Sequence, residues 1–320
     1  MSGGKEIQTF TDSPGNVSTI AKLAEIPEED IWLAKQKCKR TRRAYKLDVQ
    51  HFMQTLSIRT YEELRKVDHR AVIAWERIMR EIDGAAPSTV RRRLSALSSL
   101  FKHLVRHHHV EKNPVTEVER PNINRREGTT PAFSKEQARR IMDLPEDNTI
   151  AGLRNRAILA LGLQVGPRRA EIAALKVGDL HQNRGFDSLR FTRKGGRREA
   201  LAIHPNTAKR IQAYLQAAGH AEDADGPMFR PLSNNGKRQE TRRPMDPDAI
   251  DRVLRKYAAA LGLDYSAHSM RATFITTALE NGCSLEDVQR AAGHADPSTT
   301  KLYDRRGYNP EKSASFFATY

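Results

Sequence analysis

The chain has 320 residues, of which 38% are hydrophobic, and it carries a formal net charge of +15 with a pI near 10. This length allows two domains with cores of their own, and the apolar content excludes a wholly disordered chain. Lysine and arginine outnumber the acidic residues by 24 to 17 in residues 1–128 and by 30 to 22 in residues 129–320. Two basic halves favour nucleic acid as the partner, with an anionic membrane as the alternative.

Neither a membrane nor a structural metal is supported by the sequence. It contains no apolar run long enough to span a bilayer, no signal-peptide core and no lipidation motif, so we set the membrane aside. Cys38 and Cys283 fall in different expected domains, which fits a reducing cytoplasm better than a disulfide framework. The histidines at 107–109 could bind a stray metal, but a basic helix end is the simpler interpretation, and we expect no metal or cofactor.

The first half of the chain is predicted to be a helical domain behind a flexible tail. Residues 1–25 are polar and are expected to be ordered only in part. Within the helical domain expected at residues 26–112, we predict a helix with Thr41 as its N-cap. The apolar stripe of this helix comprises Tyr45, Val49, Phe52 and Leu56.

A second predicted helix, in residues 87–105, has three consecutive arginines near its N-terminus. Positive charge is unfavourable at the N-terminus of a helix, because the helix dipole is positive there. This unfavourable placement favours a role for the arginines in contacts with DNA phosphates or with the major groove. A solvated basic face is the alternative interpretation of such a run of charge. The residues of this domain that we expect to bind DNA are Thr41, Arg42, Arg43, Arg91, Arg92 and Arg93.

Residues 113–132 are predicted to be a linker, because they contain several prolines and no helical period. Residues 133–310 follow as a mainly helical second domain, and residues 311–320 as a C-terminal tail. Within the second domain, alternating apolar residues flank Lys194 and two glycines, a pattern typical of a β-hairpin with a glycine-bearing turn.

The later helices of the second domain have clear boundary signals. We predict amphipathic helices at residues 247–262 and 268–281. The sequence SLED, at 284–287, is a capping box that starts the next helix, and Gly293 closes it. Asp296 and Pro297 should then cap and start a short polar helix that contains Tyr303.

Four short motifs contain groups that suit phosphoryl transfer. Each motif alone is a weak signal, but together they supply two guanidiniums, a lysine, two histidines and a tyrosine. Arginine forks fit two oxygens of a phosphate, and no acidic cluster is present in the sequence to hold magnesium. A tyrosine nucleophile would keep the broken phosphodiester as a covalent ester, ready for rejoining. The motifs are GPRRAE (166–171), RKGG (193–196), HSMR (268–271) and GH…Y (293–303).

The order and spacing of these motifs resemble the tyrosine recombinase (integrase) family, which includes the Xer and Cre proteins. The resemblance covers most of the chain, with residues 26–112 similar to the helical, SAM-like core-binding domain and residues 133–310 similar to the α+β catalytic domain. It implies a mainly α fold with a small β-sheet. It also implies a bacterial, nucleoid-associated DNA strand transferase that integrates or recombines mobile DNA without metal or ATP.

The resemblance also implies a role for each group. Arg168 and Arg271 would bind the scissile phosphate, Glu171 would support Arg168, and His294 would donate a hydrogen bond to the phosphate.

By the same resemblance, Tyr303 would attack the phosphate and form a 3′-phosphotyrosyl link, His268 would accept a proton, and Lys194 would protonate the 5′ leaving oxygen. The implied partners are double-stranded DNA with paired inverted half-sites, a homotetramer on two such sites, and accessory directionality proteins.

Three departures from the family's pattern bear on the rate of the implied strand-transfer reaction. Pro167 precedes the first arginine, so the helix there should start at Arg168 or just before it. Ala272 stands where many members have histidine, and Ala291 and Ala292 replace bulkier residues, which should loosen the packing behind His294.

Two other functions stay open on the sequence alone. One is a catalytically weak or inactive DNA-binding regulator, against which the retention of every chemical group argues. The other is a type IB topoisomerase-like enzyme, against which the short chain and the separate basic domain argue. The tail residues Phe316, Phe317 and Tyr320 either fold back onto their own domain or link neighbouring protomers.

Overall fold

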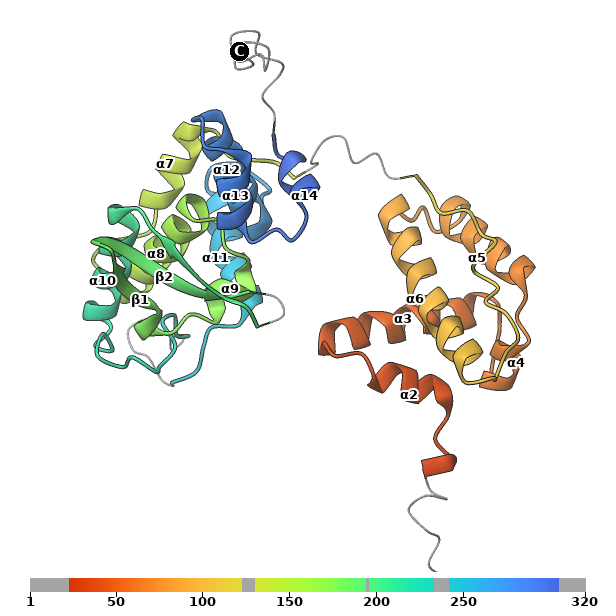
Figure 1. The fold of residues 1–320 in the computed structure, drawn as a ribbon. Coiled ribbons are helices and arrows are strands. Elements are labelled where there is room, and N and C mark those ends of the chain that lie inside the picture. The colour runs from red at the N-terminus through yellow and green to blue at the C-terminus, as the bar shows by residue number, and fades with distance from the viewer. Residues whose placement is uncertain (1–22, 123–129, 194–195, 233–241, 305–320) are drawn as a thin grey trace, which may run out of the picture. The chain divides into compact units, whose positions relative to one another are not determined.

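The computed structural model describes residues 23–122, 130–193, 196–232 and 242–304, which are mainly helical with one small sheet (Figure 1). The chain divides into two compact units, residues 1–124 and 125–320, and the division falls inside the expected linker. No helix in the described part is long and apolar enough to cross a membrane.

The first unit is a helical domain built around a tryptophan. Trp75 is fully buried, its ring meets that of Phe52 edge to face at 4.9 Å, and its indole N–H donates to His51 Nδ1 at 3.0 Å. The predicted helix boundary at Thr41 is wrong, because the Arg42 amide already donates to the Cys38 carbonyl and the helix therefore begins earlier. The helices are α2 (Glu28–Ala34), α3 (Lys39–Thr55), α4 (Tyr61–Arg65), α5 (His69–Glu81) and α6 (Pro87–Arg106).

The second unit combines helices with a three-stranded antiparallel sheet in the order β1-β2-β3. The predicted hairpin is present as β2 (Phe186–Thr192) and β3 (Arg198–Ala202), with Leu189 opposite Leu201. Strand β1 (Leu180–Asn183) was not predicted, because after its first residue the strand is polar and has no apolar alternation. The remaining elements before and after the sheet are α7 (Lys135–Asp143), α8 (Ile150–Gln164), α9 (Arg169–Ala173), the 3-10 helix η1 (Val177–Asp179) and α10 (Pro205–Ala217).

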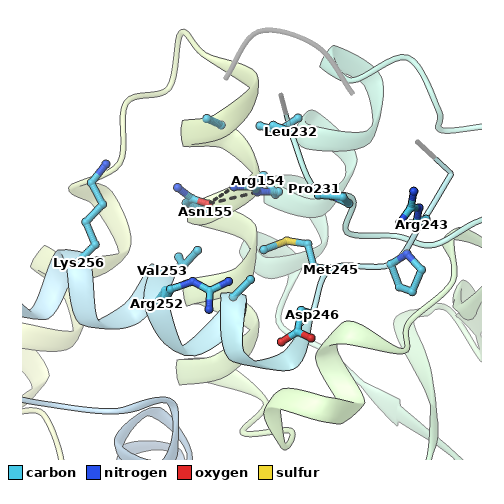
Figure 2. Close-up of a pocket in the computed structure, with 13 residues that line it drawn as sticks. Arg154, Asn155, Pro231, Leu232, Arg243, Met245, Asp246, Arg252, Val253 and Lys256 are labelled. Carbon is cyan, nitrogen blue, oxygen red and sulfur yellow. Dashed lines mark hydrogen bonds between the residues drawn. The ribbon is translucent and has the colours of Figure 1, made fainter. Parts of the chain in front are cut away.

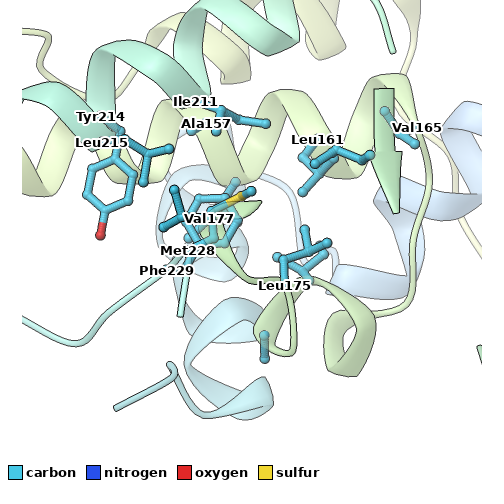
Figure 3. Packing of buried hydrophobic residues seen from close by; sticks show 14 of the residues in the cluster. Ala157, Leu161, Val165, Leu175, Val177, Ile211, Tyr214, Leu215, Met228 and Phe229 are labelled. Carbon is cyan, nitrogen blue, oxygen red and sulfur yellow. The ribbon is translucent and has the colours of Figure 1, made fainter. Parts of the chain in front are cut away.

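The main core of this unit lies between α8, α10 and the segments that flank the sheet (Figure 3). Ala157 and Leu161 of α8 face Ile211 of α10, and Tyr214 stacks on Phe229 with ring centroids 5.8 Å apart. This core fixes α8, which in turn packs against α9 and α12. The scaffold beneath the four predicted motifs is therefore mainly apolar, with a few buried polar residues such as Asn155 and Thr207.

The last four helices are α11 (Pro247–Ala259), α12 (Ala267–Glu280), α13 (Leu285–Ala292) and α14 (Pro297–Lys301). The prediction that α12 is amphipathic is wrong: it packs against α8, α11 and α13, and its buried residues lie on all sides. The caps were predicted correctly, since Gly293 adopts a left-handed φ of 62° and the Asp296 side chain accepts from the Ser298 amide. Tyr303, however, lies after the end of α14, because the helix stops at Lys301 and Leu302 is its C-cap.

Candidate active site

Arg168 is held at the N-terminus of α9 by Glu171. The helix was predicted to start at Arg168 or just before it, but it starts one residue later, at Arg169, and Arg168 is its N-cap. Glu171 accepts from the Arg168 backbone amide at 2.8 Å through Oε2 and from Arg168 Nη1 at 2.8 Å through Oε1. Arg168 Nη2 donates to the Gly293 carbonyl at 3.1 Å. The guanidinium is thus oriented but remains partly open to solvent.

Arg271 is a buried cation held by backbone carbonyls. It is 2% exposed, and its Nη1 and Nη2 donate to the carbonyls of Gly166 at 2.7 Å and Ala292 at 2.5 Å. Burial, together with the nearby charge of Arg168, lowers the pKa of Arg271 to about 10. Arg271 forms no salt bridge within the described residues. An anion that enters the site stabilises a buried cation of this kind more than it would stabilise a cation exposed to solvent.

Gly166 is required for this arrangement. It has a φ of 68°, and a Cβ at this position would lie 2.4 Å from the ring of Phe274. Any other residue would therefore be strained here and would press on Phe274, next to the carbonyl that holds Arg271.

Tyr303 meets both predicted histidines. Its hydroxyl lies 3.0 Å from His268 Nε2, and its ring stacks on that of His294 with centroids 6.2 Å apart. The Nδ1 atom of His294 lies 2.9 Å from Thr300 Oγ1, which orients the imidazole. Tyr303 is only 8% exposed and packs in an apolar cluster with Ile275 and Val288, among others.

The environment sets the protonation states of these three groups. Burial raises the pKa of Tyr303, although the charges of Arg271 and Arg168 oppose the shift. Burial also lowers the pKa of His268 and lowers that of His294 to about 3, and the same two arginines add to both shifts. At neutral pH the phenol is therefore protonated and His268 neutral, so the tyrosine donates to Nε2. This is the geometry of a nucleophile beside a general base.

Arg193 is a site residue that the sequence analysis overlooked. It is buried, and its guanidinium donates to Glu171 Oε2 at 2.9 Å, Glu199 Oε2 at 3.1 Å and the Ala291 carbonyl at 2.7 Å. It thereby joins the hairpin, α9 and the end of α13. The only signal in the sequence was its place in RKGG, where the analysis singled out its neighbour Lys194. Lys194 itself lies outside the described residues.

Among the hollows in the described part of this unit, two are lined by several arginines. One, of about 440 Å³, borders the catalytic groups and is lined by Arg193, Arg197, Gln289, Arg290 and His294, among others. The second, of about 640 Å³, lies between α8, α11 and the residues that precede α11 (Figure 2). One carboxylate, that of Asp246, lies among the side chains that line it. The cations that line it are Arg154, Arg243, Arg252 and Lys256.

The arginines predicted to bind DNA in the first unit make contacts inside that unit. Arg92 forms a salt bridge with Asp48, which is 4% exposed, and Arg93 Nη1 lies 3.9 Å from Asp83 Oδ2. Arg42 Nη2 donates to two backbone carbonyls, each at 3.1 Å. The three consecutive arginines are therefore not simply a solvated face, and DNA contact through them stays a prediction.

Arg91 and the start of α3 complete that predicted surface. Arg91 Nη1 donates to the Pro121 carbonyl at 3.4 Å, while Arg43 is exposed and Thr41 half-buried, both on the first turns of α3.

Comparison with known proteins identifies the family. The phage integrase family matches residues 131–309, and the N-terminal SAM-like domain of phage integrases matches residues 28–108. The chain belongs to the phage integrase family. The predicted family and fold class are thereby confirmed.

Relatives within this family are named tyrosine recombinases. This chain is 30% identical to tyrosine recombinase XerC of Roseiflexus castenholzii over 267 residues, which cover 81% of each chain. It is 30% identical to XerD of Lacticaseibacillus casei over 223 residues, which cover 69% of this chain and 73% of the relative.

Solved structures show the same fold. A lambda integrase dimer bound to a COC′ core site matches with a TM-score of 0.66 at 15% identity and covers 89% of this chain and 78% of its own. XerH recombinase bound to its difH substrate, in a pre-cleavage complex, matches with a TM-score of 0.64 at 19% identity. The match covers 88% of this chain and 80% of the XerH chain.

Proposed function

We propose that the protein is a site-specific DNA recombinase that cuts and rejoins strands through a 3′-phosphotyrosyl intermediate. The observation that carries this proposal is the contact of 3.0 Å between the Tyr303 hydroxyl and His268 Nε2, beside two oriented arginines. Membership of the phage integrase family, whose relatives are named tyrosine recombinases, supports it.

In the proposed cleavage step, the Tyr303 oxygen forms a bond to phosphorus and the bond from phosphorus to the 5′ oxygen breaks. The phenolic proton passes to His268, which is neutral and already accepts from it. The 5′ oxygen takes a proton from Lys194, a role that rests on the family resemblance. Rejoining is the reverse: a 5′ hydroxyl attacks the phosphotyrosine and Tyr303 regains its proton. No net oxidation or external energy is required, because one phosphoester replaces another.

The charge that develops on the phosphate is met by three groups. Arg168 and Arg271 come from different elements, and each is fixed by hydrogen bonds before substrate arrives. His294, with its Nδ1 atom near Thr300, can present Nε2 to a non-bridging oxygen. Such preorganised donors lower the barrier without reorganisation during the reaction. That cleavage needs no metal or other cofactor remains a prediction.

The assembly is proposed on the same basis. We expect double-stranded DNA with paired inverted half-sites, bound by the helical first unit and the catalytic second unit, and a homotetramer that joins two such sites. A solved structure of similar fold is a lambda integrase tetramer bound to a Holliday junction. Accessory directionality proteins remain an expectation, and the C-terminal tail residues that would link protomers lie outside the described residues.

Covalent trapping tests the proposal. A DNA site with a nick near the cleavage position releases a short fragment after cutting, so the protein–DNA link accumulates. Wild-type protein should form the link, and Tyr303→Phe, which keeps the buried ring and loses only the hydroxyl, should form none. If Tyr303→Phe traps DNA as well as wild type does, the assignment is wrong. Absence of trapping by wild type on its own site would favour the inactive DNA-binding regulator.

Strand exchange separates recombination from simple relaxation. Two duplexes with different labels, each carrying the full site, should yield recombinant products of mixed label. A topoisomerase would relax a supercoiled plasmid but would give no mixed product.

A further inference from the structure

Imidazoles and one carboxylate gather where α2 meets the C-terminal end of α6 in the first unit. Glu28 is the first residue of α2, His103 lies in the last turn of α6, and His107 is the C-cap of α6. The spacing of four residues places the two imidazoles on one face of the helix. One ligand atom from each of the three side chains lies within 4.8 Å of the other two.

The contacts within this cluster already bring its donor atoms together. His103 Nε2 lies 2.7 Å from Glu28 Oε2, and the rings of His103 and His107 have centroids 4.4 Å apart. A third imidazole is near, with His109 Nε2 at 3.9 Å from Glu28 Oε1. The Lys35 ammonium lies 3.4 Å from His107 Nε2. Since an ammonium only donates, that nitrogen presents its lone pair to a cation.

We propose that Glu28, His103 and His107 form a binding site for a divalent transition metal ion of the zinc type. Imidazole nitrogens and a carboxylate oxygen are the donors that zinc takes in proteins, at about 2.0–2.2 Å. In a tetrahedral site at those distances the ligand atoms stand about 3.3 Å apart, so no pair here must close by more than roughly 1.5 Å. His109 or a water supplies the fourth ligand.

The required movement falls on side chains that can make it. His107 and Lys35 are both exposed, so the imidazole can turn inward while the ammonium swings into solvent. His103 is buried and Glu28 half-buried, and their mutual contact fixes the other two ligands in advance. Glu28 and His103 are therefore already held in place, and His107 is the ligand that moves.

A bound ion would join α2 to the end of α6. Elsewhere the two helices meet through Trp32, which is buried and donates to Ser99 at 3.1 Å. The metal would add a second link between the two helices, at the other end of α2. It would therefore raise the stability of the first unit. It takes no part in strand cleavage, because Tyr303, Arg168 and Arg271 belong to the second unit.

The test uses full-length protein without a histidine tag, stripped of metal and titrated with zinc. Calorimetry gives the stoichiometry and affinity, thermal melting gives the change in stability, and visible absorption after cobalt substitution reports the ligand set. His107→Gln and Glu28→Gln each remove one ligand. His108→Asn is the matched control, since His108 belongs to the same run of histidines, is exposed outside the cluster and has a φ of 59°, which asparagine tolerates.

We expect one zinc per chain, a higher melting temperature with zinc, and a loss of affinity of about tenfold or more in His107→Gln and in Glu28→Gln. His108→Asn should bind as wild type does. The proposal is overturned if wild type binds no zinc, if both ligand variants keep wild-type affinity, or if His108→Asn loses as much affinity as His107→Gln.

Discussion

Arg193→Ala should impair both stability and DNA cleavage, because this side chain stands between the buried carboxylate of Glu171 and the half-buried carboxylate of Glu199. The side chains of Arg193 and Glu171 are each 6% exposed, and that of Glu199 is 12% exposed. Removal of one partner from a buried ion pair costs about 3–5 kcal/mol. Glu171 keeps its contact with Arg168, which places the expected loss near the lower end, about 3 kcal/mol. For a unit of this size the melting temperature should fall by about 6–12 °C.

The effect on cleavage follows from the position of Glu171. This carboxylate orients the guanidinium of Arg168 and also accepts from Arg193, so without Arg193 it is free to shift. Loss of the bond to the Ala291 carbonyl also loosens the turn that carries His294. A displacement of about 1 Å at a reacting group costs roughly a hundredfold in rate, which is the loss we expect.

Covalent trapping on the nicked site, with DNA at saturation and below the melting temperature, measures this rate. Arg197→Ala is the control, since Arg197 is 78% exposed and lies 3.8 Å from the same Glu199. A double variant with Glu171→Gln separates positioning from folding: once that charge is gone, loss of Arg193 should cost less. Cleavage by folded Arg193→Ala within about threefold of wild type would refute the reasoning.

Three further predictions concern the phosphate site. Arg271→Ala should slow trapping by about a thousandfold or more while DNA binding in a gel shift changes far less, and a loss that appears mainly in binding would contradict its proposed role. The cleavage rate should be level at neutral pH and should fall only below the ordinary histidine value of 6.5, because the pKa of His268 is lowered and its neutral form accepts the proton; a fall that begins above pH 7 would argue against His268 as base. Binding should weaken steeply with salt, by about 0.9 log units per log unit of salt for each phosphate neutralised, and a flat response would exclude the proposed phosphate contacts.

Local signals in the sequence predicted local structure well. The cap at Asp296, the glycine at 293 and the β2–β3 hairpin were predicted correctly because each depends on residues within a few positions of one another. The pairing of Tyr303 with His268 was expected only through the family resemblance, since the two are 35 residues apart.

Features that depend on distant partners could not be predicted. The salt bridge of Arg92 is with Asp48, 44 positions away, and nothing near Arg92 in the sequence indicates that partner. Arg193 carries no motif of its own, and its three partners come from three elements. The burial of α12 on all sides likewise follows from where three other helices pack. In each case tertiary context overrides the local pattern.

The two carbonyls that hold Arg271 bear on the stage of folding at which this protein would become able to cut DNA. They belong to Gly166 and Ala292, 105 and 21 positions away from the arginine in the chain. The cation is therefore positioned only when both of these distant segments have closed on α12. On the proposed mechanism, a nascent or partly unfolded chain would carry the proposed nucleophile without the aligned charge, and we expect it not to break DNA. Strand breakage would then require a molecule that has finished folding, which is also the form that would reseal the strand.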